Sequence, residues 1–436
     1  MKSRTLRKDK VNIITLGCSK NMVDSEVLSG QLLANDISVV HESAKKDHNI
    51  VIVNTCGFID KAKEESVNTI LEQVELKRRG RLDKVYVTGC LSERYRNNLE
   101  AEIPEVDAYF GTMELPLILK RFEANYQAEL IGERLLSTPS HYAYLKISEG
   151  CNRTCSFCAI PLMRGQHTSK TIEQLVAEAE GLVKRGVKEV MLIAQELTYY
   201  GLDIYKRREL PRLLHALADV KGLEWIRLHY AYPSKFPLEI LDAVRERDNI
   251  CNYLDMPLQH ASNNMLKAMR RQITREEMTE LIYNIREKVP GICLRTTLIA
   301  GFPGETEDDV EELKGFLEEH RFDRVGIFSY SHEEGTGAYS LVDNIPQEVK
   351  ESRCQEIMEV QQEISLEKNQ EKVGKVFKVI VDKKEAGRYL GRTEFDSVEV
   401  DNEVVINTPK PLPIGDFVQV KITKAFDYDL EGDVIA

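Results

Sequence analysis

The sequence predicts an α/β protein with three parts: a doubly wound N-terminal domain, a partial (βα)6 barrel, and a small five-stranded β-barrel at the C-terminus. Strand-like segments rich in β-branched residues alternate with amphipathic helical segments as far as Ser331, which is typical of parallel sheets. The last stretch of about 65 residues contains short strand-like segments without a helical pattern. At 436 residues, the chain is also too long for one compact core.

The first domain is expected to span residues 1–135. Its first helix is expected to begin near Asp24, and a long helical run extends from Asp60 to about Arg79. Because strands alternate with these helical runs, a largely parallel sheet is predicted. The strand segments are Asn12–Leu16, Ile50–Val53 and Val85–Val87.

The second domain is expected to span residues 136–367 and to contain six strand segments separated by helical patterns. Right-handed connections between parallel strands would arrange these six βα units as an open barrel. Eight units close such a barrel, whereas six leave a lateral opening that admits a bulky substrate. The six segments are 143–148, 189–194, 225–230, 253–258, 293–302 and 324–330.

The third domain is expected to span residues 368–436. A charged helical stretch from Pro346 to Gly374 precedes most of it and is interpreted as a linker. Five strand segments in so short a length fit a small barrel of the oligonucleotide-binding kind. These segments are 375–383, 389–396, 397–407, 416–426 and 429–436.

Composition favours a globular protein of a reducing compartment. Apolar residues make up 42% of the chain and charged residues 30%, and no apolar run reaches the length of a membrane span. The basic N-terminus is not followed by a small-residue cleavage site, so no signal peptide is expected and the cytoplasm is the expected location. Nine cysteines cannot all pair as disulfides, which favours metal binding or chemistry for those that are grouped.

The charge of the chain favours a basic protein as partner over nucleic acid. The net charge is −12, and residues from Gln370 onward contain 10 Lys or Arg against 13 Asp or Glu. RNA binding normally relies on a basic surface that neutralises phosphates. A basic patch hidden in this negative total remains the alternative, formed by Lys372, Lys375, Lys378, Lys383 and Lys384.

A group of three cysteines with the spacing CxxxCxxC is the strongest functional signal. Cys151, Cys155 and Cys158 follow the first strand of the expected barrel, at the end where barrel active sites lie. Three thiolates can hold a [4Fe-4S] cluster and leave the fourth iron open to chelate S-adenosylmethionine, which the reduced cluster then cleaves to a radical. A structural zinc site is the alternative, but zinc prefers four protein ligands, and His167 is the nearest further candidate.

Three further cysteines each follow a strand of the first domain. Cys18, Cys56 and Cys90 are widely spaced in the sequence, but the carboxyl ends of parallel strands share one crevice. Each cysteine has a neighbouring glycine, which allows the backbone to come close to a cluster. The sequence therefore predicts a second iron–sulfur cluster here; three independently buried cysteines are the alternative.

Several polar residues at strand ends of the barrel are candidates for cofactor or substrate contact. Gln195 and Glu196 follow the second strand and are expected to hold the methionine amino group, and the Gly301–Glu305 turn is expected to contact the adenine. Arg295 lies on the strand before that turn, and Phe157 is expected beside the cluster or the nucleoside. Ordinary packing or a structural ion pair is the alternative for each of them, as it is for further strand-end residues: Arg227, His229, Gln259 and His260.

The remaining cysteines have no metal-like spacing. Two lie in strand patterns and one in a helical pattern, so all three are expected to be packing residues. They are Cys251, Cys293 and Cys354.

The chain resembles the radical S-adenosylmethionine methylthiotransferases over nearly its whole length, with a terminal segment similar to a TRAM domain. The three spaced cysteines, the CxxxCxxC group and the small β-domain occur in that order. Several strings resemble the branch that methylthiolates an aspartate of small-subunit ribosomal protein uS12 (the RimO type): LGCSKNMVDSE, VNTCGFIDKAKEES, VTGCLSERY, CAIPLMRG and IAGFPGETEDD. Glu196 departs from the Asp more usual in that branch, but keeps the carboxylate.

This resemblance implies two [4Fe-4S] clusters and two molecules of S-adenosylmethionine, one as methyl donor and one as radical source. The radical would abstract hydrogen from the aspartate β-carbon, which would then take up a methylthio group. It also implies uS12 as protein partner, nucleic acid contact only through the ribosome, no membrane, and an electron donor such as flavodoxin or ferredoxin. The catalytic residues beyond the cofactor ligands stay unknown. The rivals are a tRNA-adenosine methylthiotransferase, a non-catalytic iron–sulfur module, and a radical enzyme with a different product.

Overall fold

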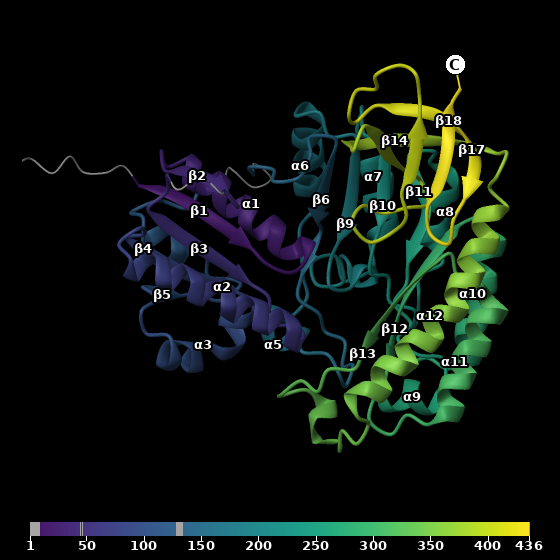
Figure 1. The fold of residues 1–436 in the computed structure, drawn as a ribbon, viewed down its shortest axis with the longest axis horizontal. Helices are drawn as coiled ribbons and strands as arrows, with labels where there is room; N and C mark the ends of the chain where they lie inside the picture. The colour runs from purple at the N-terminus through teal and green to yellow at the C-terminus, as the bar shows by residue number, and fades with distance from the viewer. Residues whose placement is uncertain (1–8, 44, 46, 128–133, 436) are drawn as a thin grey trace, which may run out of the picture. The chain divides into compact units, whose positions relative to one another are not determined.

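The computed structural model describes residues 9–43, 45, 47–127 and 134–435. By its contacts this part of the chain divides into two units, which Figure 1 shows as ribbons. The first unit contains the described residues up to Thr138, together with Glu149–Asn152 and Ala159–Gln166. The second contains Pro139–Ser148, Arg153–Cys158 and the described residues from His167 onward. The basic segment 1–8, considered above for a signal peptide, lies outside the described residues.

The first unit is a doubly wound parallel sheet, as predicted. Its strand order is β2-β1-β3-β4-β5, and every pair is parallel. Alternate side chains of β3 point to opposite faces, so Val51 and Val53 pack with α2 and α3 while Ile50 and Ile52 pack with α1 and α4. The strands are β1 (Lys10–Thr15), β2 (Ser38–His41), β3 (Ile50–Thr55), β4 (Lys84–Gly89) and β5 (Ala108–Tyr109). The helices are α1 (Ser19–Leu33), α2 (Asp60–Arg78), α3 (Cys90–Glu102), α4 (Leu115–Lys120) and α5 (Ile160–Arg164).

Helix α1 begins at Ser19, so the predicted start near Asp24 was wrong. Cys18 is extended (φ −102°, ψ 169°) and serves as the N-cap position, and its carbonyl accepts the first helical bond from Met22 N–H at 3.1 Å. The sequence hid this start because no Ser, Thr, Asp or Asn stands at the cap position. The early start means that Cys18 itself lies where strand β1 turns into the helix.

The second unit contains the predicted six-stranded parallel sheet, in the order β13-β12-β11-β10-β9-β6. Its strands are β6 (Tyr142–Lys146), β9 (Glu189–Ile193), β10 (Trp225–Leu228), β11 (Ile250–Asp255), β12 (Cys293–Ala300) and β13 (Arg324–Ser329). Its helices are α6 (Ile172–Lys184), α7 (Leu210–Ala218), α8 (Glu239–Glu246), α9 (Asn263–Ala268), α10 (Arg275–Lys288), α11 (Glu307–His320) and α12 (Gln347–Gln370). Its short elements are β8 (Thr168–Ser169) and the 3₁₀ turns η2 (Leu197–Tyr199) and η3 (Gly337–Ser340), and the two residues of β7 (Ser148–Glu149) are divided between the units.

The stretch interpreted as a linker is a packed helix of this unit. Helix α12 lies against β12, β13 and α11, and it buries Ile357 and Ile364. Arg353 of the same helix is also buried, where it pairs with Glu305 at 3.0 Å. The high charge of the segment suggested a linker exposed to solvent. The structure instead buries one side of the helix against β12, β13 and α11.

The chain ends in the predicted closed barrel of five strands, in the order β14-β15-β16-β18-β17. The strands are β14 (Val376–Glu385), β15 (Arg388–Thr393), β16 (Val404–Asn407), β17 (Phe417–Ala425) and β18 (Leu430–Val434). Ile380 and Phe417 of this barrel pack against Trp225 and Tyr253 of the parallel sheet, and Figure 1 shows β14 and β17 near β10 and β11. The barrel and the sheet are therefore one compact unit.

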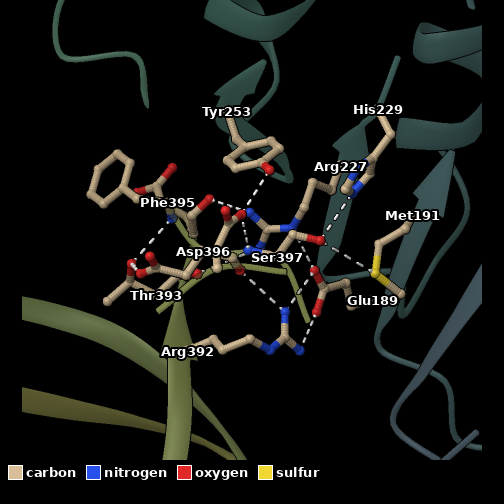
Figure 2. Close-up of polar contacts among 12 residues, drawn as sticks. Glu189, Met191, Arg227, His229, Tyr253, Arg392, Thr393, Phe395, Asp396 and Ser397 are labelled. Carbon is tan, nitrogen blue, oxygen red and sulfur yellow. Dashed lines mark hydrogen bonds and ion pairs between the residues drawn. The ribbon is translucent and has the colours of Figure 1, made fainter. Parts of the chain in front are cut away.

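The third barrel strand starts at Val404 and not at Ser397 as predicted. Residues Thr393–Asp401, called the barrel loop below, leave the barrel and lie against the parallel sheet (Figure 2). Side chains from all six sheet strands bond to this loop. They are Tyr144 (to Glu399), Met191 (to Ser397), Arg227 (to Thr393 and Glu394), Tyr253 and Arg295 (to Asp401), and Arg324 (to Asp396).

Buried charges also join the barrel to the sheet. Arg227 donates to Glu189 at 2.8 Å, and Arg392 at the end of β15 donates to the same carboxylate at 2.8 Å (Figure 2). Burial opposes ionisation of Glu189, but the two guanidinium groups outweigh it and lower its pKa. Removing one partner of a buried pair leaves an uncompensated charge, which typically costs about 3–5 kcal/mol. The parallel sheet therefore depends on the terminal barrel for its stability.

None of the described helices is long and apolar enough to cross a membrane.

Replacing Asp396 of the barrel loop tests this dependence. Asp396 accepts bonds from Arg324 Nε at 3.1 Å and Nη2 at 2.5 Å, and both side chains are buried. Asp396→Asn is expected to lower the free energy of unfolding by about 3 kcal/mol, because Arg324 loses its counter-charge. Urea unfolding of the full chain measures this. The control Asp242→Asn breaks more exposed pairs with Arg245 and Lys288 and should cost less than about 1 kcal/mol; equal effects would contradict the argument.

Candidate functional site

The three cysteines of the first unit lie at the carboxyl ends of neighbouring strands. Cys56 follows β3, Cys90 follows β4, and Cys18 follows the turn after β1. Burial raises the pKa of the Cys90 thiol to about 12, Arg164 opposes this, and the charges of Cys18 and Cys56 add to it. Burial also raises the pKa of Cys56, with a smaller contribution from Cys18. The strand order β1-β3-β4 brings the three strand ends to one edge of the sheet.

Two of the glycines beside these cysteines are needed for the close approach of the strand ends. A Cβ at Gly17, whose φ is +89°, would lie 2.7 Å from Cys56 Cβ and 2.8 Å from its Sγ. A Cβ at Gly57 would lie 2.8 Å from the backbone of Leu91. Any larger residue would push the cysteine-bearing turns apart.

Sequence reasoning missed two buried residues that hold this site. Asn21 donates to Leu16 O at 2.7 Å and to Thr55 O at 3.0 Å, and its Oδ1 accepts a bond from Arg164. Arg164 also pairs with Asp24 at 2.6 Å. Asn21 therefore joins the ends of β1 and β3, while Arg164 brings a positive charge to Cys90. The strings LGCSKNMVDSE and CAIPLMRG contain them, but nothing in their spacing marks them out.

The CxxxCxxC segment is divided between the two units. Cys151 belongs to the first unit and is buried, and its N–H donates to Gly165 O at 3.1 Å. Cys155 and Cys158 belong to the second unit, where Cys158 N–H donates to Cys155 O at 3.2 Å. The Cys155–Cys158 turn therefore places two thiols on one tight turn that follows the first strand of the parallel sheet.

A stack of charged and aromatic side chains surrounds Cys155. The guanidinium of Arg153 lies 3.9 Å from the ring centre of Tyr199 and 3.8 Å from that of Tyr232. Arg153 also pairs with Glu196 at 3.2 Å, and Arg271 Nη1 donates to Cys155 Sγ at 3.2 Å. None of Arg153, Tyr232 and Arg271 was identified from the sequence, because their partners are distant along the chain.

The residues predicted to bind S-adenosylmethionine lie at strand ends of the second unit. Gln195 is half-buried after β9, and the carboxylate of Glu196 accepts bonds from Thr198 N–H at 2.7 Å and from Arg153. Glu305 accepts a bond from Gly301 N–H at 2.8 Å and so closes the turn after β12. The carboxylates of this group are thus already engaged in fixing their own loops.

Phe157 and Arg295, two further candidates for cofactor contact, are held by neighbouring side chains. Phe157 packs on an apolar cluster that includes Met269, Phe302 and Tyr330. The Arg295 guanidinium pairs with Asp255 at 3.0 Å and with Asp401 of the barrel loop at 3.2 Å. As placed, the charge of Arg295 is balanced by two buried carboxylates.

The structure also gives the partners of the other polar candidates and of the three remaining cysteines. His229 bonds to Ser397 at 2.9 Å, and His260 Nδ1 accepts from Ala261 and Ser262 N–H at 3.0 Å. Gln259 holds β12 through backbone bonds. Cys251 and Cys293 lie in the apolar cluster under the barrel, and Cys354 contacts Ser329 at 3.5 Å.

Positive charges lie beside two of the cysteine thiols. Within the described ranges, no three Cys, His, Asp or Glu side chains stand in an arrangement that holds a metal ion. The positive charges of Arg164 and Arg271 beside cysteine sulfurs suit clusters bound by thiolates, which are negatively charged.

A six-stranded parallel βα sheet with a CxxxCxxC segment after its first strand defines a radical S-adenosylmethionine enzyme. The family comparisons agree: the Radical SAM superfamily matches residues 145–317, the "Uncharacterized protein family UPF0004" matches 10–111, and the TRAM domain matches 373–435. Among solved structures, the radical S-adenosylmethionine methyltransferase TsrM from Kitasatospora setae shares the fold. Its TM-score is 0.56 at 16% identity, over 73% of this chain and 72% of that one.

The chain belongs to the family of RimO ribosomal protein uS12 methylthiotransferases. It is 60% identical to the member from Flavobacterium psychrophilum over 434 residues, which are 99% of this chain and 100% of the relative. It is 58% identical to the member from Cytophaga hutchinsonii over 436 residues, which are 100% of both. The member from Bacteroides thetaiotaomicron is 52% identical over 432 residues, 99% of both. This family works with two [4Fe-4S] clusters and S-adenosylmethionine, so the cofactors inferred from the cysteines are those of the family.

Iron content tests the assignment of the first three cysteines. Cys90→Ala should lower the iron bound after anaerobic reconstitution from about eight to about four atoms per chain, because one of two four-iron clusters loses a ligand. The matched control is Cys354→Ala, which removes a half-buried cysteine on α12 and should leave the iron content unchanged. Full iron in the Cys90→Ala protein would contradict the assignment.

Asp255 makes the stability of the strand ends depend on pH. Burial opposes ionisation of Asp255, but Arg295 and His229 outweigh it and lower its pKa to about 2. The unfolded value is about 3.9, so the stabilisation is complete above about pH 4 and is lost as the pH falls toward 2. Asp255→Asn should therefore be destabilised by roughly 2 kcal/mol at neutral pH, and its difference from the wild type should shrink below pH 4. Urea unfolding across this range measures it; a difference that is independent of pH would exclude the carboxylate as the cause.

Proposed function

We propose that this protein methylthiolates the β-carbon of an aspartate in small-subunit ribosomal protein uS12. The observation that carries the proposal is full-length similarity to RimO enzymes, at up to 60% identity over 99% of the chain. The six cysteines proposed below as cluster ligands are present in the sequence. The acidic charge of the chain, −12, suits a basic ribosomal protein.

Six cysteines are proposed as cluster ligands in two sets of three. Cys18, Cys56 and Cys90 would hold the auxiliary cluster, and Cys151, Cys155 and Cys158 would hold the cluster that binds S-adenosylmethionine. When bound, these groups supply the adenosyl radical that abstracts hydrogen from carbon and the methylthio group that replaces it. An unactivated C–H bond has no acidic proton, so no side chain of the protein is proposed as a general acid or base.

The residues of the second unit are proposed to bind and orient the cofactor. Gln195 and Glu196 stand after β9, where they would receive the methionine ammonium group, and Glu196 already accepts bonds from N–H donors. The turn from Gly301 to Glu305, which the Glu305 carboxylate closes, would contact the adenine through its backbone. Phe157 would exclude water beside the cofactor from its apolar cluster.

Arg295 is proposed to act on the cofactor site through Asp255. Asp255 accepts a bond from Tyr230 N–H at 3.3 Å and pairs with Arg295, so it joins the ends of β10 and β11 to β12.

A low-potential donor such as flavodoxin or ferredoxin is proposed to supply electrons, and the cytoplasm is the proposed location. Contact with nucleic acid is proposed only through the ribosome that contains the substrate.

The substrate is tested with the reconstituted holoenzyme under anaerobic conditions. The enzyme receives reductant, sulfide, S-adenosylmethionine and either a peptide from the target loop of uS12 or a tRNA anticodon stem-loop. Mass spectrometry is expected to find a methylthio group on the peptide aspartate only. The matched controls are the same peptide with Asn at the target position and the Cys155→Ala enzyme, which should give no product. Product on the RNA alone would establish the tRNA enzyme instead.

A further inference from the structure

Arg271 is a buried arginine whose side chain points at a proposed cluster ligand. It follows helix α9 and is 3% exposed. Its Nη1 donates to Cys155 Sγ at 3.2 Å, and its Nη2 donates to Pro257 O at 2.5 Å. The guanidinium carbon lies 4.2 Å from the ring centre of Tyr232, and the Tyr232 hydroxyl donates to Arg271 O at 2.7 Å. Tyr232 therefore holds both the backbone carbonyl of Arg271, through its hydroxyl, and the guanidinium group, through its ring.

The charge of Arg271 has no carboxylate partner in the part of the chain that the structure describes, and its Nε is buried without a hydrogen bond. Every other buried arginine in this part does pair with a carboxylate. They are Arg134 (Glu26), Arg153 (Glu196), Arg164 (Asp24), Arg227 and Arg392 (Glu189), Arg324 (Asp396) and Arg353 (Glu305). A buried charge without a counter-charge is costly, so Arg271 needs an anion that the polypeptide alone does not provide.

Arg153 lies on the same tyrosine ring as Arg271, but its positive charge is paired with a carboxylate. It lies on the ring of Tyr232 as Arg271 does, at 3.8 Å from the ring centre. Its charge is matched by the carboxylate of Glu196, which lies 3.2 Å away. Arg271, on the same ring, has no such carboxylate among the described residues and donates to the Cys155 sulfur instead.

We propose that Arg271 is the counter-charge of the iron–sulfur cluster held by Cys151, Cys155 and Cys158, and that it raises the reduction potential of that cluster. The proposal rests on the cluster assignment made under the proposed function. A cluster with three thiolate ligands is negatively charged, and one electron from a low-potential donor adds a further negative charge. A buried cation and an N–H···S bond stabilise the reduced state more than the oxidised state, which makes reduction easier. Arg271 is a positioning residue in this role, because it acts through the Cys155 sulfur.

The reduction potential of the cluster tests the proposal directly. The full-length chain with Cys18, Cys56 and Cys90 replaced by Ala carries only the cluster in question, so its electron paramagnetic resonance signal is unambiguous. In this background Arg271→Gln should shift the midpoint to more negative potential. At the midpoint of the unsubstituted background, the ratio of reduced to oxidised cluster should fall roughly tenfold. Arg271→Lys keeps the charge and should restore most of the shift.

The matched control is Arg270→Gln, which removes the same charge from the neighbouring residue, whose side chain is exposed. It should leave the midpoint potential unchanged.

Circular dichroism and iron content are measured on every variant. Loss of iron from folded Arg271→Gln, with iron retained by Arg271→Lys and Arg270→Gln, would also support a counter-charge. Equal midpoints for Arg271→Gln and Arg270→Gln at full iron would overturn the proposal, and so would Lys shifting the midpoint as far as Gln. Absence of a cluster in the Ala background alone would instead refute the cluster assignment.

Discussion

The buried charges on the inner face of the six-stranded sheet are the constraint on which the second unit depends. An open sheet of six strands has no seventh and eighth strand to fill its interior, and here Arg227, Arg295 and Arg324 project into it. The barrel loop supplies carboxylates and carbonyl groups to these arginines and contacts every strand. The terminal barrel is therefore part of the sheet's interior as well as a domain of its own, and the two are expected to fold together.

The same constraint reaches the end of β10 through a short chain of contacts. Asp401 of the barrel loop holds Arg295, Arg295 holds Asp255, and Asp255 fixes the backbone where β10 ends. Each link is a short contact between buried or nearly buried groups, so the strand ends have little freedom to shift. The positions of these strand ends are therefore fixed in part by the carboxylate of the barrel loop.

Different parts of the site could be predicted from the sequence to different extents. Most strands and the parallel class of both large sheets were predicted, because period-two and helical patterns repeat over many residues; the short strands β2 and β5 were not. The strand-end positions of Cys18, Cys56 and Cys90 followed from parallel topology, which brings such ends to one edge. The start of α1 and the barrel loop were missed, since a cysteine is an unusual N-cap and Ser397–Glu403 has the alternating pattern of a strand.

The sequence alone determined the fold class and singled out the six thiols, because hydrophobic periodicity and the CxxxCxxC spacing are local patterns and the other three cysteines each follow a strand-like segment. Tertiary structure decided the partners of the charged residues. Nothing near Arg271 in the sequence says that its carboxylate partner is missing, and nothing near Arg295 says that Asp401, 106 residues away, balances it. Burial and pairing are properties of the three-dimensional neighbourhood, since the cost of a charge depends on which groups surround it and not on its neighbours along the chain.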